Sequence, residues 1–202
     1  MQPADLLSLP PDLPVPLDDG ACGHLPGLAM PAIALRSTDG VDVRLDDPTA
    51  PRTIVFAYPR TGRPGEEPPG GTAAWNAIPG ARGCTPQACA YRDHFAELTA
   101  LDVRVFGLST QDTAYQRELV DRMGLPYPIL SDEHLALAAA LRLPTFETEG
   151  LTLLRRQTLV IEGGRIEHVF YPVFPSDRDA EQVVEWLKAR AGTPNGGTAP
   201  GA

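Results

Sequence analysis

Two cysteines a short distance apart are the residues of this sequence that most clearly could do chemistry. Cys84 and Cys89 stand where a Gly- and Pro-rich stretch gives way to apolar residues at helical spacing. Thr85 is a candidate N-cap, and Pro86 is tolerated in the first turn of a helix. Cys84 is therefore predicted at a helix N-terminus, where backbone N–H groups and the helix dipole favour a thiolate. Because the thiolate is the reactive form, the pattern predicts a nucleophilic cysteine at position 84.

Length and composition favour one acidic globular domain. The chain has 202 residues, 43% of them hydrophobic, which is enough for one sizeable core. Its formal net charge of −9 argues against binding to nucleic acid or to an anionic membrane surface. No segment approaches the ~18 apolar residues of a membrane span, and the proline-broken N-terminus lacks the basic start of a secretory signal. Three cysteines in such a chain do not suggest a disulfide scaffold, so we expect a cytoplasmic protein with reactive thiols.

The chain divides by composition into three regions. Residues 1–27 are rich in proline and are expected to form an extended N-terminal arm. Residues 28–191 carry the pattern of a folded domain, and the small, polar residues 192–202 are expected to be disordered. Within the domain, residues 62–83 form a long Gly- and Pro-rich loop before the cysteine helix. Because Trp75 gives this loop apolar surface to bury, it is predicted to be an ordered flap; a mobile surface insertion is the alternative.

Strands and helices alternate along the domain as in an α/β fold. Runs of β-branched and apolar residues predict strands at 53–58, 103–108, 158–161 and 166–170. Helical spacing, with a short strand after the second helix, predicts helices over 86–99, 112–123, 132–142 and 177–191. The candidate signals at element ends are Asp112 and Ser131 as N-caps, Gly124 and Gly192 as helix ends, and Gly163-Gly164 as a hairpin turn. This order indicates a mixed β-sheet flanked by helices in the thioredoxin-like layout.

Three segments together resemble the peroxiredoxin family. They are GCTPQACAYRDHF (83–95), VFGLST (105–110) and RRQTLVI (155–161), and the similarity extends roughly over residues 28–190. The resemblance is nearest to the Q type, or bacterioferritin-comigratory-protein branch. It implies a thioredoxin-like peroxidase domain that reduces hydrogen peroxide or organic hydroperoxides without a metal or organic cofactor. It also implies recycling by thioredoxin or a glutaredoxin-like dithiol protein, in a monomer or a homodimer.

The resemblance assigns roles to the two thiols. In the family the first cysteine attacks the peroxide and becomes a sulfenic acid, so Cys84 is expected to be peroxidatic. A second cysteine five residues later resolves the sulfenic acid to a disulfide, which is the role expected of Cys89. Five residues of α-helix separate two Cα atoms by about 8–9 Å, whereas a disulfide tolerates roughly 4.4–6.8 Å. The first turn must therefore unwind before the sulfurs can bond, and Gly83 and Pro86 make that turn weakly held.

The family also places an arginine two residues before a Thr or Ser that opens an apolar strand. Arg156 stands in this position before Thr158. Its charge would hold Cys84 as a thiolate and would polarise the O–O bond as negative charge moves to the leaving oxygen. The neighbouring Arg155 would point to the opposite face of the strand, so only Arg156 is expected to serve the site.

The sequence departs from the family pattern just before the first cysteine. The pattern Pro-x-x-x-Thr-x-x-Cys would place its Pro and Thr where this chain has Ala77 and Ala81. We predict that Pro59 and Thr61, at the end of the first central strand, take their places and that the flap separates them from the cysteine only in sequence. Thr61 would then hydrogen-bond the peroxide, and Pro59 would shield the thiolate from water.

For other residues near the cysteines, the sequence allows either a role in the site or a structural role. Thr72 and Thr85 compete with Thr61 as the hydroxyl group of the site. Gln87 and Arg92 match the family run but suit structural roles equally well.

Three other functions can be drawn from the same thiols. A zinc site of Cys84, Cys89 and His94 would have longer spacings than structural zinc sites favour, and it would need a fourth ligand. A thioredoxin-like disulfide oxidoreductase would want a Cys-x-x-Cys pair, which the sequence lacks. A non-catalytic redox sensor would need the same reactive thiol, so only turnover separates it from a peroxidase. Cys22 is expected to be a plain free thiol, with a second resolving role as the alternative if the arm folds back.

Overall fold

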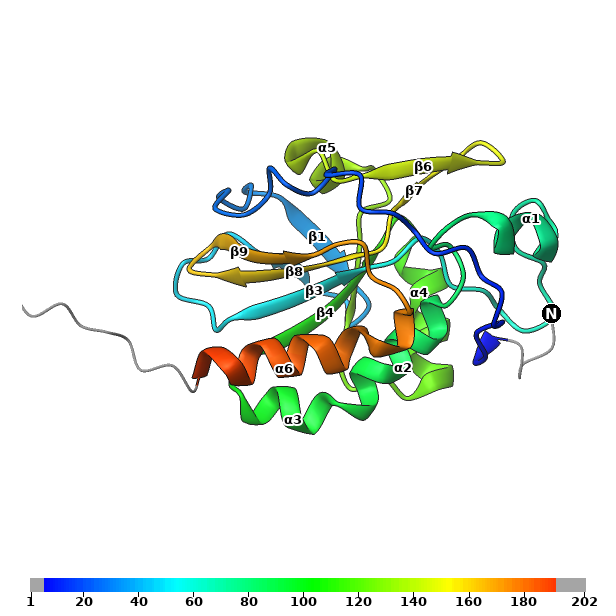
Figure 1. Cartoon of the computed structure of the whole chain (residues 1–202). Helices are drawn as coiled ribbons and strands as arrows, with labels where there is room; N and C mark the ends of the chain where they lie inside the picture. The colour runs from blue at the N-terminus through cyan, green and yellow to red at the C-terminus, as the bar shows by residue number, and fades with distance from the viewer. Residues whose placement is uncertain (1–5, 192–202) are drawn as a thin grey trace, which may run out of the picture.

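A mixed β-sheet of seven strands forms the centre of the protein, in a computed structural model that describes residues 6–191 (Figure 1). The strand order is β2-β1-β5-β4-β3-β8-β9. The strands are β1 (Ala34–Ser37), β2 (Asp42–Arg44), β3 (Thr53–Ala57), β4 (Arg104–Ser109), β5 (Ile129–Ser131), β8 (Gln157–Glu162) and β9 (Arg165–Phe170). The central strands β3, β4 and β5 are parallel, and β1 and β8 pair with them antiparallel. A separate hairpin consists of β6 (Thr145–Thr148) and β7 (Leu151–Leu154).

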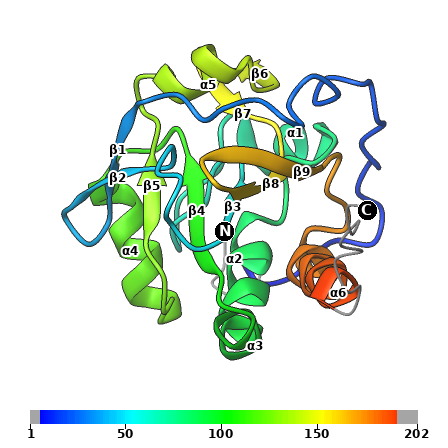
Figure 2. The same ribbon diagram turned by 90° about the vertical axis from the view of Figure 1, so that its left-hand side faces the viewer.

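Helices cover both faces of this sheet. They are α1 (Gly71–Ala77), α2 (Cys84–Asp93), α3 (Phe95–Ala100), α4 (Thr113–Met123), α5 (Ala136–Leu141), the 3-10 turn η2 (Ser176–Arg178) and α6 (Asp179–Ala191). Figures 1 and 2 show α2, α3, α4 and α6 below the sheet and α5 above it. The N-terminal arm starts near α2, runs along the side of the sheet and then passes above it. The α/β fold with a mixed sheet and flanking helices is the one that the sequence predicts.

The apolar residues of the strands alternate between two cores. On β3, Ile54 and Phe56 pack with α2, α4 and α6, whereas Val55 and Ala57 pack with α5 and the arm. Side chains of successive strand residues point to opposite faces, so a strand that is covered on both faces is apolar throughout. Burying each large side chain contributes about 1.5–3 kcal/mol relative to leaving it exposed. The continuous apolar run of β3 is therefore what fixes this strand in the middle of the sheet.

The predicted element boundaries need three corrections. Helix α2 begins at Cys84 with Gly83 as its N-cap, so Thr85 lies inside the helix and does not cap it. The helix predicted over 86–99 is two helices, because the chain leaves helical geometry at His94. Ser131 ends β5 and is not a helix cap; α5 starts later, and the carboxylate of Asp132 accepts hydrogen bonds from two N–H groups of its first turn.

Short elements are the ones that sequence periodicity missed. The four strands β1, β2, β6 and β7 and the helix α1 each have seven residues or fewer, and α1 lies inside the predicted flap. A strand of three or four residues, or a helix of about two turns, is too short for its hydrophobic period to be recognised in the sequence. The predicted hairpin turn is confirmed, since Gly163 and Gly164 both have positive φ and join the antiparallel pair β8–β9.

The N-terminal arm packs on the domain over its described part. Leu6, Cys22 and Leu25 are buried, and the Gly27 N–H group donates to the Ile166 carbonyl of β9. Gly192 and the tail predicted to be disordered, residues 192–202, lie outside the described residues. Among residues 6–191, no helix combines the length and apolar character that crossing a membrane requires.

The N-cap of α4 gives a test of local helix stability. Asp112 Oδ1 accepts a hydrogen bond from the N–H group of Tyr115 at 2.7 Å. We expect Asp112→Ala to lower the free energy of unfolding by about 1 kcal/mol, because one N–H group of the first turn loses its partner. Urea denaturation measures this change, and Asp121→Ala on the exposed side of the same helix is the matched control. Equal effects of the two substitutions would contradict the capping role.

Candidate active site

The start of α2 is fixed by a close contact with the segment before α6. Gly83 has φ 101°, and a Cβ atom there would lie 2.2 Å from Ser176 Oγ. Only glycine fits this position, both for its conformation and for its space. The Ser176 hydroxyl also donates a hydrogen bond to the Gly83 carbonyl at 2.9 Å. The backbone next to Cys84 is therefore held from both sides, and the sulfur sits at the N-terminal end of the helix.

Arg156 lies directly beside this sulfur. Its Nη2 is 3.2 Å from Cys84 Sγ, and it also lies 3.1 Å from the carbonyl oxygens of Gly80 and Arg82. The arginine is only 3% exposed, so its charge acts in a region from which water is largely excluded. Arg155 points the other way and pairs with Asp19 at 2.8 Å. The structure thus brings Arg156, and not Arg155, to the cysteine.

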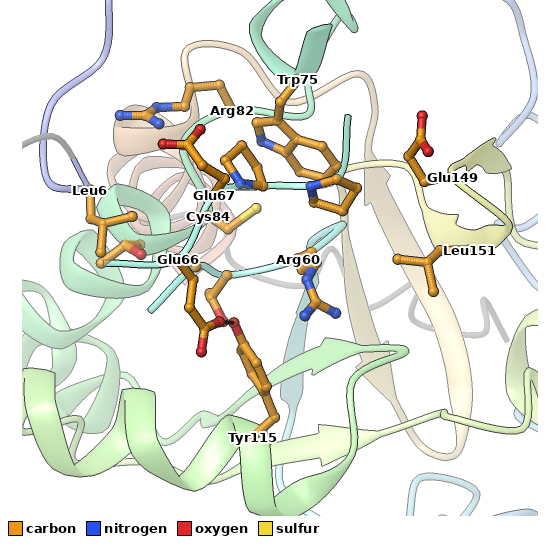
Figure 3. A pocket seen from close by; sticks show the side chains of 16 residues that line it. Leu6, Arg60, Glu66, Glu67, Trp75, Arg82, Cys84, Tyr115, Glu149 and Leu151 are labelled. Carbon is orange, nitrogen blue, oxygen red and sulfur yellow. Dashed lines mark hydrogen bonds between the residues drawn. The ribbon is translucent and has the colours of Figure 1, made fainter. Parts of the chain in front are cut away.

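A cavity of about 350 Å³ opens beside the thiol, as Figure 3 shows. Its wall contains residues of the arm, of the flap and of α2, among them Leu6, Glu67, Trp75, Cys84 and Thr85. Trp75 is buried against Ala81 and Leu153 and tilts toward Phe146 of the β6–β7 hairpin, with ring centroids 6.4 Å apart. The segment predicted to be a flap is therefore an ordered wall of the cavity that holds the cysteine.

Charged and aromatic groups tie the beginning of the flap to α4. The guanidinium of Arg63 lies 3.9 Å from the ring centroid of Tyr115, and that of Arg60 lies 4.7 Å from it. The Tyr115 hydroxyl donates to Glu66 at 3.1 Å. Cation–π contacts at partly exposed sites are each worth about 0.5–1 kcal/mol. Sequence reasoning did not single out these residues, because nothing in their spacing marks them.

Thr61 lines the cavity, whereas Pro59 does not. Thr61 is buried in the cavity wall, and both its N–H and its hydroxyl donate to Gln111 Oε1, at 2.9 and 3.1 Å. Pro59 is buried after the end of β3 and is not among the residues that line the cavity. Of the competing hydroxyls, Thr85 lines the cavity, whereas Thr72 bonds Glu67 at 2.7 Å and lies outside the lining.

The other two thiols are buried in less reactive surroundings. Cys89 lies in the same helix as Cys84, and burial raises the pKa of its thiol. Cys22 donates to Gln157 Oε1 at 2.9 Å on the face of the sheet opposite α2, and burial raises its pKa to about 12. A thiol with so high a pKa carries almost no thiolate at neutral pH, so Cys22 is a poor nucleophile.

Two further sequence candidates have ordinary surroundings. Arg92 donates to the Met123 carbonyl at the end of α4 and to Asp93. His94 contacts Glu97 through Nδ1 at 3.0 Å. In the described part of the chain no group of three or more His, Cys, Asp or Glu side chains is placed to hold a metal ion, and this includes the set Cys84, Cys89 and His94.

Two residues near the cysteine were missed by sequence reasoning. Ser176 holds Gly83, and Asp179 accepts a hydrogen bond from Gln87 at 2.7 Å. Both occur in the stretch PSDRD, which reads from sequence only as the polar start of a helix with acids favoured by its dipole. No local signal connects this stretch to a cysteine more than 90 residues earlier in the chain.

A thiol at a helix N-terminus with a buried guanidinium beside it, on this α/β scaffold, defines a cysteine-dependent redox protein of the thioredoxin-like fold. Residues 25–184 match the Redoxin family, and the chain belongs to that family. Within it the chain is a peroxiredoxin, a thiol peroxidase, similar to the Bcp and peroxiredoxin Q proteins. The predicted resemblance to this group is thereby confirmed.

The similar proteins come from bacteria, fungi and plants. Peroxiredoxin Bcp of Escherichia coli (strain K12) is 28% identical over 165 residues, which cover 80% of this chain and 94% of that protein. Putative peroxiredoxin Q, chloroplastic, of Oryza sativa subsp. indica is 28% identical, over 83% of this chain and 69% of its own length. Peroxiredoxin bcp1 of Schizosaccharomyces pombe is 34% identical, and that match spans 52% of this chain and 46% of the relative.

Solved structures share the fold over most of the chain. Peroxidoxin BcpB from Mycobacterium tuberculosis has a TM-score of 0.65 at 23% identity, covering 82% of this chain and 98% of that chain. Peroxiredoxin Q of Xanthomonas campestris has a TM-score of 0.62 at 17% identity, covering 89% and 99%. The central sheet and its helices are therefore those of known peroxiredoxins.

The two arginines give a matched test of the charge beside the thiol. We expect Arg156→Ala to slow the reaction of Cys84 with peroxide on the order of 100- to 1,000-fold, because the cation in contact with the sulfur is lost. Arg155→Ala leaves this rate unchanged, since that side chain pairs with Asp19. Stopped-flow kinetics with hydrogen peroxide measures the rate constant of each variant. If the two variants behave alike, Arg156 has no special role.

Proposed function

We propose that this peroxiredoxin reduces hydrogen peroxide or organic hydroperoxides at Cys84, with Cys89 as the resolving thiol and thioredoxin or a glutaredoxin-like dithiol protein as the reductant. The observation that carries the proposal is the 3.2 Å contact of Arg156 with Cys84 Sγ at the edge of an open cavity. A reactive thiol needs a nearby cation and access for its substrate, and this arrangement supplies both.

The first step is a two-electron transfer from sulfur to peroxide. The Cys84 thiolate attacks one peroxide oxygen, the S–O bond forms and the O–O bond breaks. The sulfur becomes a sulfenic acid, and the leaving oxygen takes a proton to become water or an alcohol. Arg156 lies where it can stabilise the thiolate and the charge that develops on the departing oxygen. Thr61 is the hydroxyl that we expect to bind the peroxide, since Gln111 already takes its proton and leaves its lone pairs free to accept.

The cavity supports organic peroxides as substrates alongside hydrogen peroxide. Its volume of about 350 Å³ falls within the roughly 300–1,000 Å³ that is usual for pockets that bind small organic molecules. Apolar side chains such as Leu6, Trp75 and Leu151 line part of it. The bacterioferritin comigratory protein of Xanthomonas campestris, which has the same fold, has alkyl peroxide reduction activity.

The second step joins Cys89 to the oxidised sulfur. The Cys89 thiolate attacks the sulfenic sulfur, a disulfide forms and water leaves. Both cysteines lie in one intact helix, so about 8–9 Å separates their Cα atoms and the first turn must open. Burial raises the pKa of Cys89 while the helix is closed, so this thiol becomes a better nucleophile once the turn exposes it. A dithiol protein then reduces the disulfide.

Substitution of Cys84 tests the peroxidase activity itself. We expect Cys84→Ser to abolish peroxide consumption in the presence of a dithiol reductant, because neither of the other two thiols has a cation in contact with its sulfur among the described residues. A coupled turnover assay measures this loss, with Cys22→Ala as the control that keeps full activity. A sensor would react with peroxide once and would not turn over. Activity that survives in Cys84→Ser would overturn the assignment.

Substitution of Cys89 tests the resolving step. Cys89→Ser keeps the first turnover, loses recycling by the dithiol protein and becomes prone to irreversible overoxidation at Cys84. Mass mapping of the peroxide-treated wild-type protein is expected to find an intramolecular Cys84–Cys89 disulfide, together with lost amide protection over 84–91. A dominant bridge from Cys84 to Cys22, or between two chains, would reject Cys89 as the resolving thiol.

A further inference from the structure

A buried carboxyl group lies behind the cysteine, outside the cavity wall. Asp179 is the first residue of α6 and has no exposed surface. Its Oδ2 accepts hydrogen bonds from Gln87 Nε2 (2.7 Å), Thr158 Oγ1 (2.7 Å) and the Tyr91 hydroxyl (3.0 Å). An acid in the first turn of a helix usually faces solvent and the helix dipole. This one instead joins α6 to α2 and β8 at a single atom.

Gln87 connects this carboxyl group to the arginine of the site. Arg156 Nη1 donates to Gln87 Oε1, while Nη2 of the same guanidinium lies 3.2 Å from Cys84 Sγ. A side-chain amide has one donor end and one acceptor end. Because Asp179 accepts from the amino end of Gln87, the carbonyl end must face the guanidinium. An amide turned the other way would set its N–H groups against those of Arg156.

We propose that Asp179 is a positioning residue for peroxide reduction: by fixing the orientation of Gln87, it holds the guanidinium of Arg156 against the sulfur of Cys84. The proposal rests on the function proposed above for Cys84 and Arg156. Asp179 touches neither the sulfur nor the cavity. The hydrogen-bonded link from Asp179 to Arg156 runs through Gln87, whereas its bonds to Tyr91 and Thr158 hold the helices and the strand together.

The test measures the reactivity of Cys84 in a protein whose other two thiols are replaced by the substitutions Cys22→Ala and Cys89→Ser. The rate of Cys84 alkylation by iodoacetamide is measured against pH, and the rate constant with hydrogen peroxide is measured by stopped flow. Gln87→Met and Asp179→Leu are each expected to shift the alkylation profile to higher pH and to slow the peroxide step on the order of 10- to 100-fold, because the guanidinium is no longer held in place. The double variant is no slower than either single one, since both act through one link.

Two conservative variants separate positioning from packing. Asp179→Asn retains most of the peroxide rate, because its carbonyl oxygen accepts from Gln87. Its amino group takes the place of Oδ1, which has no hydrogen-bond partner among the described residues. Tyr91→Phe removes a different donor to Oδ2 and leaves the Cys84 profile unchanged.

Several outcomes would overturn the proposal. It fails if Tyr91→Phe moves the alkylation profile as far as Gln87→Met does, or if the effects of Gln87→Met and Asp179→Leu add. If thermal melting shows that Asp179→Leu does not fold, the Gln87→Met variant decides. A wild-type alkylation profile in Gln87→Met rejects the proposal. A shifted profile in Gln87→Met, together with a near wild-type peroxide rate in Asp179→Asn, supports it. Alkylation needs no peroxide, so shifted profiles in the variants, together with a wild-type chain that does not turn over peroxide, would uphold the role of Asp179 and reject the peroxidase function.

Discussion

The guanidinium of Arg156 is the group around which the rest of the site is arranged. One of its amino groups lies within 3.4 Å of three consecutive carbonyl oxygens, from Gly80 to Arg82, and of the Cys84 sulfur. A buried guanidinium is costly unless acceptors surround it. The carbonyl groups supply these acceptors, and the loop before α2 is held in one conformation as a result. A single side chain thus shapes a loop and sets a cation beside the sulfur.

The flap shows how a long insertion can be accommodated without disturbing such a site. It is anchored at its start by Arg63 on Tyr115, in its middle by Trp75 against Phe146, and at its end by the guanidinium. Between these anchors it runs around the cavity, so that Thr61 and Cys84 line the same space although many residues separate them. Loop closure depends only weakly on loop length, which is why the three anchors suffice.

Sequence reasoning succeeded where the signal is local and failed where it is not. The position of Cys84 follows from a glycine, a proline and an apolar period within one helix. That Arg155 and Arg156 face opposite sides follows from the two-residue period of a strand, and the resemblance to the family indicated which of them faces the cysteine. The cap was misassigned because Thr85 is a common capping residue, whereas the close approach of Ser176 demands a glycine two residues earlier, at position 83. The part played by Asp179 was out of reach, because a polar helix start does not reveal what its side chain contacts.

The residues that contact each other at this site lie far apart in sequence, so the site is assembled only when most of the chain has been synthesised. The sulfur and the guanidinium are 72 residues apart in sequence, and Gly83 and Ser176 are 93 apart. Synthesis delivers the N-terminal part first, so Cys84 leaves the ribosome long before the groups that activate it. On the mechanism proposed above, the cysteine would react with peroxide as an ordinary thiol until the guanidinium lies beside it. That dependence on the completed fold would protect the growing chain from oxidation of Cys84.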